Sequence, residues 1–235
     1  MDTKEKNIHR VDIPVELDEE RIIKLLRTRK GSSRLEQAAR ELIEIARGAA
    51  RPKALYQVSH PHVIDGDTVD IDGTRFTSRI LSRCLTGVDT VYPFIATAGR
   101  ELDELPVPPG DLWRQLCLDT VKTVLLVGAV DYLSGYINEH FSIPHTSHMN
   151  PGEIEDWPLS QQLPLFRLFD GTEKDIGVTL SKSGVMKPVK SRSGILFPDD
   201  TGFVSCRFCT QSRCPGRSAA YDPALVKEYL GTGAA

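Results

Sequence analysis

Two Asp-Gly pairs separate short apolar runs in residues 54–76, and this pattern limits the kind of sheet that the chain can build. The runs read ALYQV, VID and VDID, and the pairs are Asp65-Gly66 and Asp72-Gly73. Asp-Gly is a preferred sequence for the tight turn between two antiparallel strands. The same acidic string lacks the glutamate that closes a helix–loop–helix calcium site. We therefore interpret it as turn chemistry between short antiparallel strands.

Helical periodicity dominates on either side of these strands. Residues 18–30 and 32–50 carry apolar positions at helical spacing, so residues 1–52 are predicted to form a helical hairpin that Arg51-Pro52 ends. Residues 111–140 form the longest helical stretch. The other expected elements are a helix over 80–85, a buried strand over 90–98, a short helix over 160–169, strands over 176–180 and 192–197, and a last helix at Asp222-Pro223.

Helices mixed with hairpin-linked strands predict an α+β fold, with a twisted, mainly antiparallel sheet and flanking helices. We divide the chain into the helical hairpin of residues 1–52, an α+β core of residues 53–204, and a cysteine-rich segment with a terminal helix in residues 205–235. A chain of 235 residues that is 40% hydrophobic supports a real core.

Charge and hydropathy exclude several classes of partner. The net charge of −3 gives no indication of a nucleic-acid groove or an anionic membrane surface. The longest apolar run, TVLLVGAV, is too short to span a bilayer, which takes about 20 residues. The polar start, MDTKEKNIHR, lacks the apolar stretch of a signal peptide. A cytoplasmic location is expected.

Four short motifs follow one another between Phe94 and Phe197. In chain order they are Thr97, Gly99 and Glu101; Pro151-Gly152 with Leu165-Phe166 fourteen positions later; Ile176, Gly177, Leu180, Ser181 and Ser183; and Ser191, Ser193 and Gly194. In residue type, order and spacing, this set resembles the activation domain of vitamin B12-dependent methionine synthase. The resemblance covers nearly half of the chain, and it implies the fold of that domain.

The resemblance also implies an activity. The activation domain binds S-adenosylmethionine beside the corrinoid, and the methyl group of this molecule, with one electron, restores methylcobalamin from the inactive Co(II) state. We therefore expect an accessory reactivation protein whose cobalamin is supplied by a partner, either a corrinoid-binding protein or a cobalamin-dependent methyltransferase. The alternative is a non-catalytic module that binds the corrinoid protein and holds a structural zinc. A weaker third alternative is a methyltransferase unrelated to corrinoids.

The resemblance places S-adenosylmethionine at one loop. The expected contacts are His148, Asn150, Pro151-Gly152 and Glu153, with the indole of Trp157 as one wall. The loop of the family usually reads R-x-x-P-G-Y, and here His148 stands at the arginine position and Glu153 at the tyrosine position. An arginine fork binds a carboxylate through two contacts at any pH, whereas histidine offers one and is charged only near or below neutrality.

Three thiols lie close together near the end of the chain. Cys206, Cys209 and Cys214 form a C-x2-C-x4-C pattern, and thiolates suit iron–sulfur clusters and zinc. We predict a [4Fe–4S] cluster that could supply the electron, with structural zinc as the alternative and free or redox-active thiols as the third interpretation. The candidates for a fourth ligand are His145, His148, Cys84 and Cys117, of which the two cysteines are more simply read as buried small hydrophobes.

Overall fold

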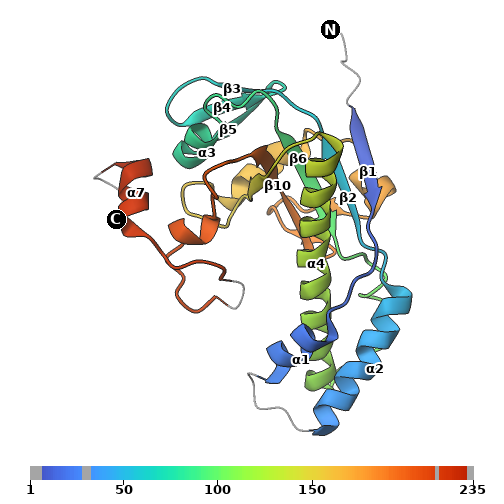
Figure 1. The fold of residues 1–235 in the computed structure, drawn as a ribbon. Coiled ribbons are helices and arrows are strands. Elements are labelled where there is room, and N and C mark those ends of the chain that lie inside the picture. Colours follow the sequence, from blue (N-terminus) through green and yellow to red (C-terminus); the bar gives the residue numbers. More distant parts are fainter. Residues whose placement is uncertain (1–6, 28–32, 215–216, 232–235) are drawn as a thin grey trace.

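An antiparallel five-stranded sheet forms the centre of the fold (Figure 1). The computed structural model describes residues 7–27, 33–214 and 217–231. Across the sheet the strands are β1 (Ile8–Asp12), β2 (Lys53–Gln57), β6 (Tyr92–Thr97), β10 (Ser191–Pro198) and β7 (Thr146–Met149). All six residues of β6 are buried, as expected of an inner strand that is covered on both faces. The α+β prediction is confirmed.

Two smaller antiparallel sheets flank the main one. β3 (Pro61–Val63), β4 (Thr68–Ile71) and β5 (Thr74–Thr77) form the hairpins predicted from the Asp-Gly pairs. At the turn between β4 and β5, Asp72 has a φ of 50° and Gly73 a φ of 83°. Two successive positive φ angles are typical of the tight hairpin turns that Asp-Gly favours. The third sheet pairs β8 (Thr179–Leu180) with β9 (Met186–Lys187).

One long helix joins the two ends of the molecule. α4 (Leu112–His140) has 29 residues, which at 1.5 Å per residue gives a length of about 43 Å. Its second half packs on the main sheet, where Leu133 and Ile137 share a core with Phe94. Its first half extends beyond the sheet and packs against α1 (Glu19–Arg27) and α2 (Ser33–Ala49) (Figure 1). We call α1, α2 and the first half of α4 the helical arm.

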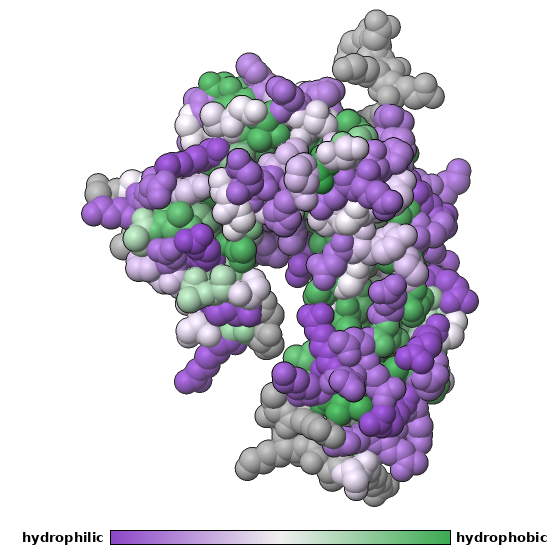
Figure 2. All heavy atoms as spheres, viewed as in Figure 1, coloured by the Kyte–Doolittle hydropathy of each residue, from purple (hydrophilic) through white to green (hydrophobic). Residues whose placement is uncertain are grey.

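The opposite face of the main sheet is covered by short elements. The elements that share its core are α3 (Arg79–Cys84), α5 (Gln162–Phe166), α6 (Thr172–Ile176), η2 (Ser205–Phe208) and α7 (Pro223–Leu230), and η1 (Leu159–Gln161) leads into α5. The core beneath them contains Trp157, whose ring meets that of Phe76 edge-on with centroids 6.2 Å apart. In the space-filling view a wide notch separates the helical arm from the C-terminal segment around η2 and α7 (Figure 2).

Two local predictions need correction. Residues 8–12 form the edge strand β1, where the sequence had predicted no strand. Residues 176–180 are not one strand, because helix α6 runs through Ile176 and Gly177 then takes a φ of 73°, so that only residues 179–180 pair. The link between α1 and α2, residues 28–32, lies outside the described residues. The division of the chain at 52 and 204 stays a prediction.

The helices that the structure describes include none long and apolar enough to cross a membrane.

Candidate functional site

The candidate site begins where the edge strand β7 ends in a tight turn. β7 pairs with β10, with His148 opposite Leu196. Beyond the strand, Gly152 has a φ of 87°, and its N–H donates to the carbonyl of Trp157 at 2.7 Å. A Cβ at position 152 would also lie 3.2 Å from Cδ1 of Leu159. The turn predicted at the Pro-Gly pair is therefore present, and its second residue favours glycine for two separate reasons.

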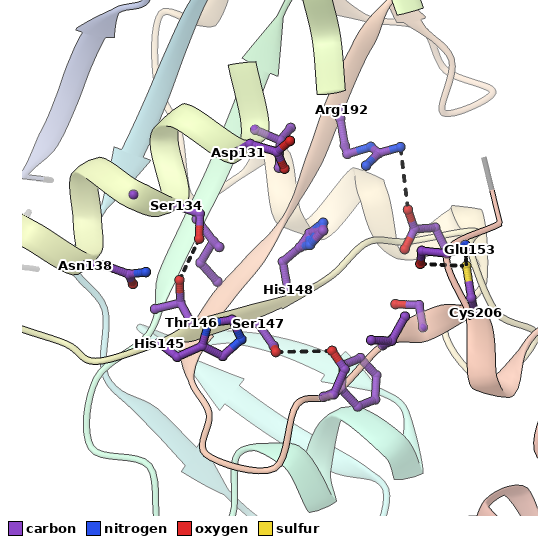
Figure 3. Close-up of a pocket in the computed structure, with 17 residues that line it drawn as sticks. Asp131, Ser134, Asn138, His145, Thr146, Ser147, His148, Glu153, Arg192 and Cys206 are labelled. Carbon is purple, nitrogen blue, oxygen red and sulfur yellow. Dashed lines mark hydrogen bonds and ion pairs between the residues drawn. The ribbon is translucent and has the colours of Figure 1, made fainter. Parts of the chain in front are cut away.

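Two cavities meet at this turn. The first, the His148 cavity, has a volume of about 560 Å³ and lies between α4, β7 and residues 203–206 (Figure 3). The second, the Pro-Gly cavity, has a volume of about 380 Å³ and is lined by residues 150–153 together with parts of β9 and β10. Small-molecule sites commonly measure about 300–1,000 Å³. Glu153 and Arg192 line both cavities and so form the wall between them.

His148 presents a neutral imidazole to the first cavity. Its ring lies between Asp131 of α4 and the side chains of Glu153 and Arg192 (Figure 3). Burial lowers the pKa of His148 below its usual value; Glu153 and Asp131 act to raise it, and the charge of Arg192 acts to lower it. The Nε2 atom is buried and has no hydrogen-bond partner among the described residues. A buried polar atom without a partner is a candidate contact for a ligand.

The depressed pKa of His148 makes the stability of the protein pH-dependent. The unfolded chain, with a histidine pKa near about 6.5, binds this proton more tightly than the folded protein does. Stability is therefore full above about pH 6.5 and falls as the pH drops towards the lower folded-state pKa. We expect the melting temperature of the wild type to fall more between about pH 7.5 and about pH 5.5 than that of His148→Gln.

Thermal unfolding followed by circular dichroism checks this expectation. His62→Gln, which changes an exposed histidine on β3, serves as the control and should respond to pH as the wild type does. An equal response of His148→Gln and the wild type would contradict the buried neutral state.

Glu153 and Arg192 form a loose ion pair. Oε1 of Glu153 lies 3.9 Å from a guanidinium nitrogen of Arg192, and the two side chains are 32% and 33% exposed. A half-exposed pair at this separation contributes at most about 1 kcal/mol to stability. Neither side chain makes another hydrogen bond or ion pair within the described part of the chain. The pair is therefore open to a ligand.

Asn150 adds unpartnered polar atoms beside this pair. Its side chain is 3% exposed, lines the Pro-Gly cavity, and has no hydrogen-bond partner for its amide oxygen or nitrogen among the described residues. It packs over Gly194 of β10, where a Cβ would clash with the Asn150 amide oxygen and lie 2.5 Å from the carbonyl of Met149. The glycine of the S-x-S-G motif thus makes the space that Asn150 fills.

Two of the motifs that carry the resemblance line the Pro-Gly cavity, through Pro151-Gly152 and through Ser191 and Ser193, and Thr97 of a third motif contacts Ser191. The hydroxyl of Ser191 lies 3.0 Å from that of Thr97, and the hydroxyl of Ser193 donates to the side-chain oxygen of Gln162 at 3.2 Å. The side-chain nitrogen of Gln162 donates to the carbonyl of Gly184 at 2.7 Å. Segments that are far apart in the sequence are therefore joined by buried hydrogen bonds at one place.

Cys206 lines the His148 cavity from the C-terminal segment (Figure 3). Its sulfur accepts hydrogen bonds from the N–H and the hydroxyl of Ser218, each at 3.5 Å. Burial alone would raise the pKa of this thiol, but the bonds from Ser218, the N–H of Ala219 and the charge of Arg217 outweigh it and lower the pKa below the ordinary value. The thiolate form is therefore more accessible here than at an ordinary cysteine.

Arg217 forms hydrogen bonds with the backbone of the cysteine segment. Its guanidinium donates to the carbonyls of Cys206 at 3.1 Å, Ala219 at 2.9 Å, Cys209 at 2.8 Å and Gln211 at 2.7 Å. One side chain thus serves as donor to four backbone carbonyls of the loop.

The structure does not gather the predicted metal ligands. Within the described ranges, no group of three or more His, Cys, Asp or Glu side chains is placed to hold a metal ion. Cys209 packs against the main hydrophobic core, whereas Cys206 shares its cavity with His145 and His148. A cluster or zinc site at Cys206, Cys209 and Cys214 stays a prediction from spacing.

The two remaining cysteines belong to the core. Cys117 is buried in the core of the helical arm, and burial raises its pKa to about 11. Cys84 packs beside the sheet core, and burial, assisted by the charge of Asp199, raises its pKa to about 12. Both behave as small hydrophobic side chains.

Trp157 does not lie where the sequence placed it. The indole is fully buried in the core against Phe76 and lines neither cavity. The ring packs in the sheet core, while the backbone takes part in the turn: the Trp157 carbonyl accepts from Gly152, and its N–H donates to the carbonyl of Ile154 at 3.2 Å. Conversely, three residues of the cavity wall were not predicted from the sequence: Arg192 of β10, and Asp131 and Ser134 of α4, whose place depends on how α4 crosses the sheet. The sequence feature that could have indicated Arg192 was its charge, between the two serines of the S-x-S-G motif.

The fold and its cavities define the class first: an α+β domain with two cavities beside the edge strand of an antiparallel sheet. In particular, the fold is similar to that in a crystal structure of the MetH reactivation domain bound to AdoHcy, with a TM-score of 0.64 and 17% sequence identity over 96% of this chain and 89% of that chain. No family model and no curated protein matches the sequence. The fold expected from the resemblance is therefore confirmed.

Proposed function

We propose that this chain is an accessory reactivation protein for a corrinoid-dependent methyltransferase, and that it binds S-adenosylmethionine at the turn of residues 150–153. The corrinoid is held by a partner protein. The observation that carries the proposal is the cluster of unpartnered buried polar atoms on His148 and Asn150 at the junction of two ligand-sized cavities. The similar MetH reactivation domain was crystallised with AdoHcy bound.

The chemistry requires two inputs. One electron reduces the Co(II) corrinoid of the partner, and the methyl group then passes from the sulfonium of S-adenosylmethionine to cobalt, which leaves S-adenosylhomocysteine. The residues of this chain bind and orient the methyl donor and limit its contact with water. Their role is positioning, which can supply a large part of a rate enhancement.

Isothermal titration of the protein with S-adenosylmethionine and with S-adenosylhomocysteine tests the proposal. We expect saturable binding of both, with one site per chain. Gly152→Ala should weaken binding by about tenfold or more, because alanine at a φ of 87° strains the turn and crowds Leu159. Gly171→Ala is the matched control: it also has a positive φ, of 76°, and a Cβ contact at 3.2 Å, but it lines neither cavity.

Equal weakening in the two glycine variants would assign the effect to general destabilisation. A wild-type protein that binds neither ligand would contradict the proposal.

The source of the electron is a separate part of the proposal. We propose that Cys206, Cys209 and Cys214 hold a [4Fe–4S] cluster, and the support is the C-x2-C-x4-C spacing together with the lowered pKa of the Cys206 thiol. Iron, sulfide and zinc analysis of anaerobically purified protein tests it. Iron with sulfide supports the cluster, and zinc without iron supports a structural site.

A non-catalytic module that recognises the corrinoid protein is the second candidate. It is favoured by the two positions that depart from the family loop, His148 in place of arginine and Glu153 in place of tyrosine. Zinc in the metal analysis, together with complex formation with a corrinoid-loaded carrier and no binding of S-adenosylmethionine, is the outcome expected for this candidate.

A further inference from the structure

One charged pair lies at the junction of both cavities and is only loosely held. Glu153 and Arg192 are the two residues with side chains of opposite charge that line the His148 cavity and the Pro-Gly cavity alike. They stand 3.9 Å apart, about one third exposed, with no other hydrogen bond or ion pair of their side chains within the described residues. A ligand can separate them at little cost, because loose surface pairs contribute little to stability.

The geometry of β10 directs Arg192 into the site. Side chains alternate along a strand, so Arg192, Gly194 and Leu196 share one face of β10. Arg192 and Leu196 both line the His148 cavity, and Gly194 between them leaves the space that Asn150 occupies. The guanidinium, the Asn150 amide and the imidazole of His148, which lies opposite Leu196 in the strand register, therefore converge on one region.

We propose that Arg192 and Glu153 clamp the zwitterionic α-amino-acid end of the ligand, an inference that rests on the proposed function. The guanidinium of Arg192 binds the α-carboxylate through its planar fork, and the carboxylate of Glu153 binds the α-ammonium. A zwitterion satisfies both charges at once, where the protein alone offers a single long contact. The amide of Asn150 and Nε2 of His148, both unpartnered among the described residues, supply neutral polar contacts beside the clamp.

This arrangement explains the residue at position 148. A buried histidine with a lowered pKa carries no charge at neutral pH and cannot hold a carboxylate as an arginine fork does. Arg192 supplies that charge from the neighbouring strand, and Glu153, at the position where the family loop has tyrosine, supplies the opposite charge next to it. The two departures from the family loop thus belong to one recognition device.

Titration calorimetry with three probes tests the clamp. S-Adenosylmethionine and S-adenosylhomocysteine carry the amino-acid end, whereas 5′-methylthioadenosine lacks it. We expect the wild type to bind S-adenosylhomocysteine about a hundredfold more tightly than 5′-methylthioadenosine. Arg192→Gln should lose about ten- to a hundredfold in affinity for S-adenosylhomocysteine and keep its affinity for 5′-methylthioadenosine, and Arg192→Lys, which keeps the charge but not the fork, should fall between.

Glu153→Gln should lose about tenfold for S-adenosylhomocysteine and leave 5′-methylthioadenosine unaffected. Arg83→Gln is the matched control, since Arg83 pairs with Glu228 at 2.8 Å and lines neither cavity. Similar melting temperatures for Arg192→Gln and Arg83→Gln establish that both fold.

Three results would overturn the clamp, and they separate its failure from that of the proposed function. Equal wild-type affinity for S-adenosylhomocysteine and 5′-methylthioadenosine, or unchanged affinity in Arg192→Gln, removes the clamp and leaves the proposed function standing. A wild type that binds neither S-adenosylmethionine nor S-adenosylhomocysteine removes the proposed function, and the clamp falls with it.

Discussion

Replacing Gly194 by alanine is expected to lower the free energy of unfolding by about 3 kcal/mol, the upper part of the range for overpacked cores. A Cβ at this position would lie 2.5 Å from the carbonyl of Met149 and 2.9 Å from Cε1 of Phe94, and it would clash with the Asn150 side chain. A carbonyl and a buried aromatic ring inside a sheet core cannot move aside cheaply. Urea unfolding followed by tryptophan fluorescence measures the change.

Gly128→Ala is the matched control for that measurement. Gly128 is exposed in the middle of α4, and nothing lies within 4 Å of the Cβ that alanine would add. Alanine in a helix interior should stabilise by about 0.5–1 kcal/mol relative to glycine. Equal unfolding midpoints for the two variants would contradict the close packing of Asn150 over β10.

Cys206 is expected to react with iodoacetamide at least about thirtyfold faster than Cys84 at neutral pH. The pKa of Cys84 is raised to about 12 from the ordinary 9.0, a difference of three units, and that of Cys206 is lowered. Such a difference reduces the thiolate fraction of Cys84 by about a thousandfold, and the greater intrinsic nucleophilicity of a high-pKa thiolate recovers only about half of it on a logarithmic scale. Mass spectrometry of the labelled peptides gives the individual rates.

Ser218→Ala should slow the alkylation of Cys206, since it removes a hydroxyl that donates to the sulfur at 3.5 Å. The reaction is run with and without prior treatment with a chelator. Joint protection of Cys206, Cys209 and Cys214 that a chelator abolishes would support the predicted metal. Reaction of Cys84 as fast as that of Cys206, with or without the chelator, would contradict the difference in pKa between the two thiols.

Periodicity and turn chemistry were sufficient to predict most of the fold. The Asp-Gly pairs, the helical spacing over residues 111–140 and the Asp222-Pro223 helix start act locally, so they are readable from neighbouring residues, and α4 and α7 lie where they were expected. β1 was not predicted because an edge strand is defined by its hydrogen bonds to a partner strand, here β2, which is distant in the sequence. Gly177 ended a helix where its apolar neighbours had suggested a strand.

The candidate site was predictable only in part, for a related reason. His148, Asn150, Pro151, Gly152 and Glu153 do line the two cavities. Burial and distance, which no single segment specifies, decided the rest: Trp157 turned into the core, and the thiols of the C-terminal segment were not gathered into a metal-binding group among the described residues. Arg192 entered the site through the pairing of β7 with β10.

The 29-residue helix α4 carries Asp131 and Ser134 in the wall of the His148 cavity and, toward its other end, the contacts with α1 and α2. A continuous hydrogen-bonded helix behaves as one rigid element. A ligand in the His148 cavity and a partner on the helical arm would therefore contact one and the same helix.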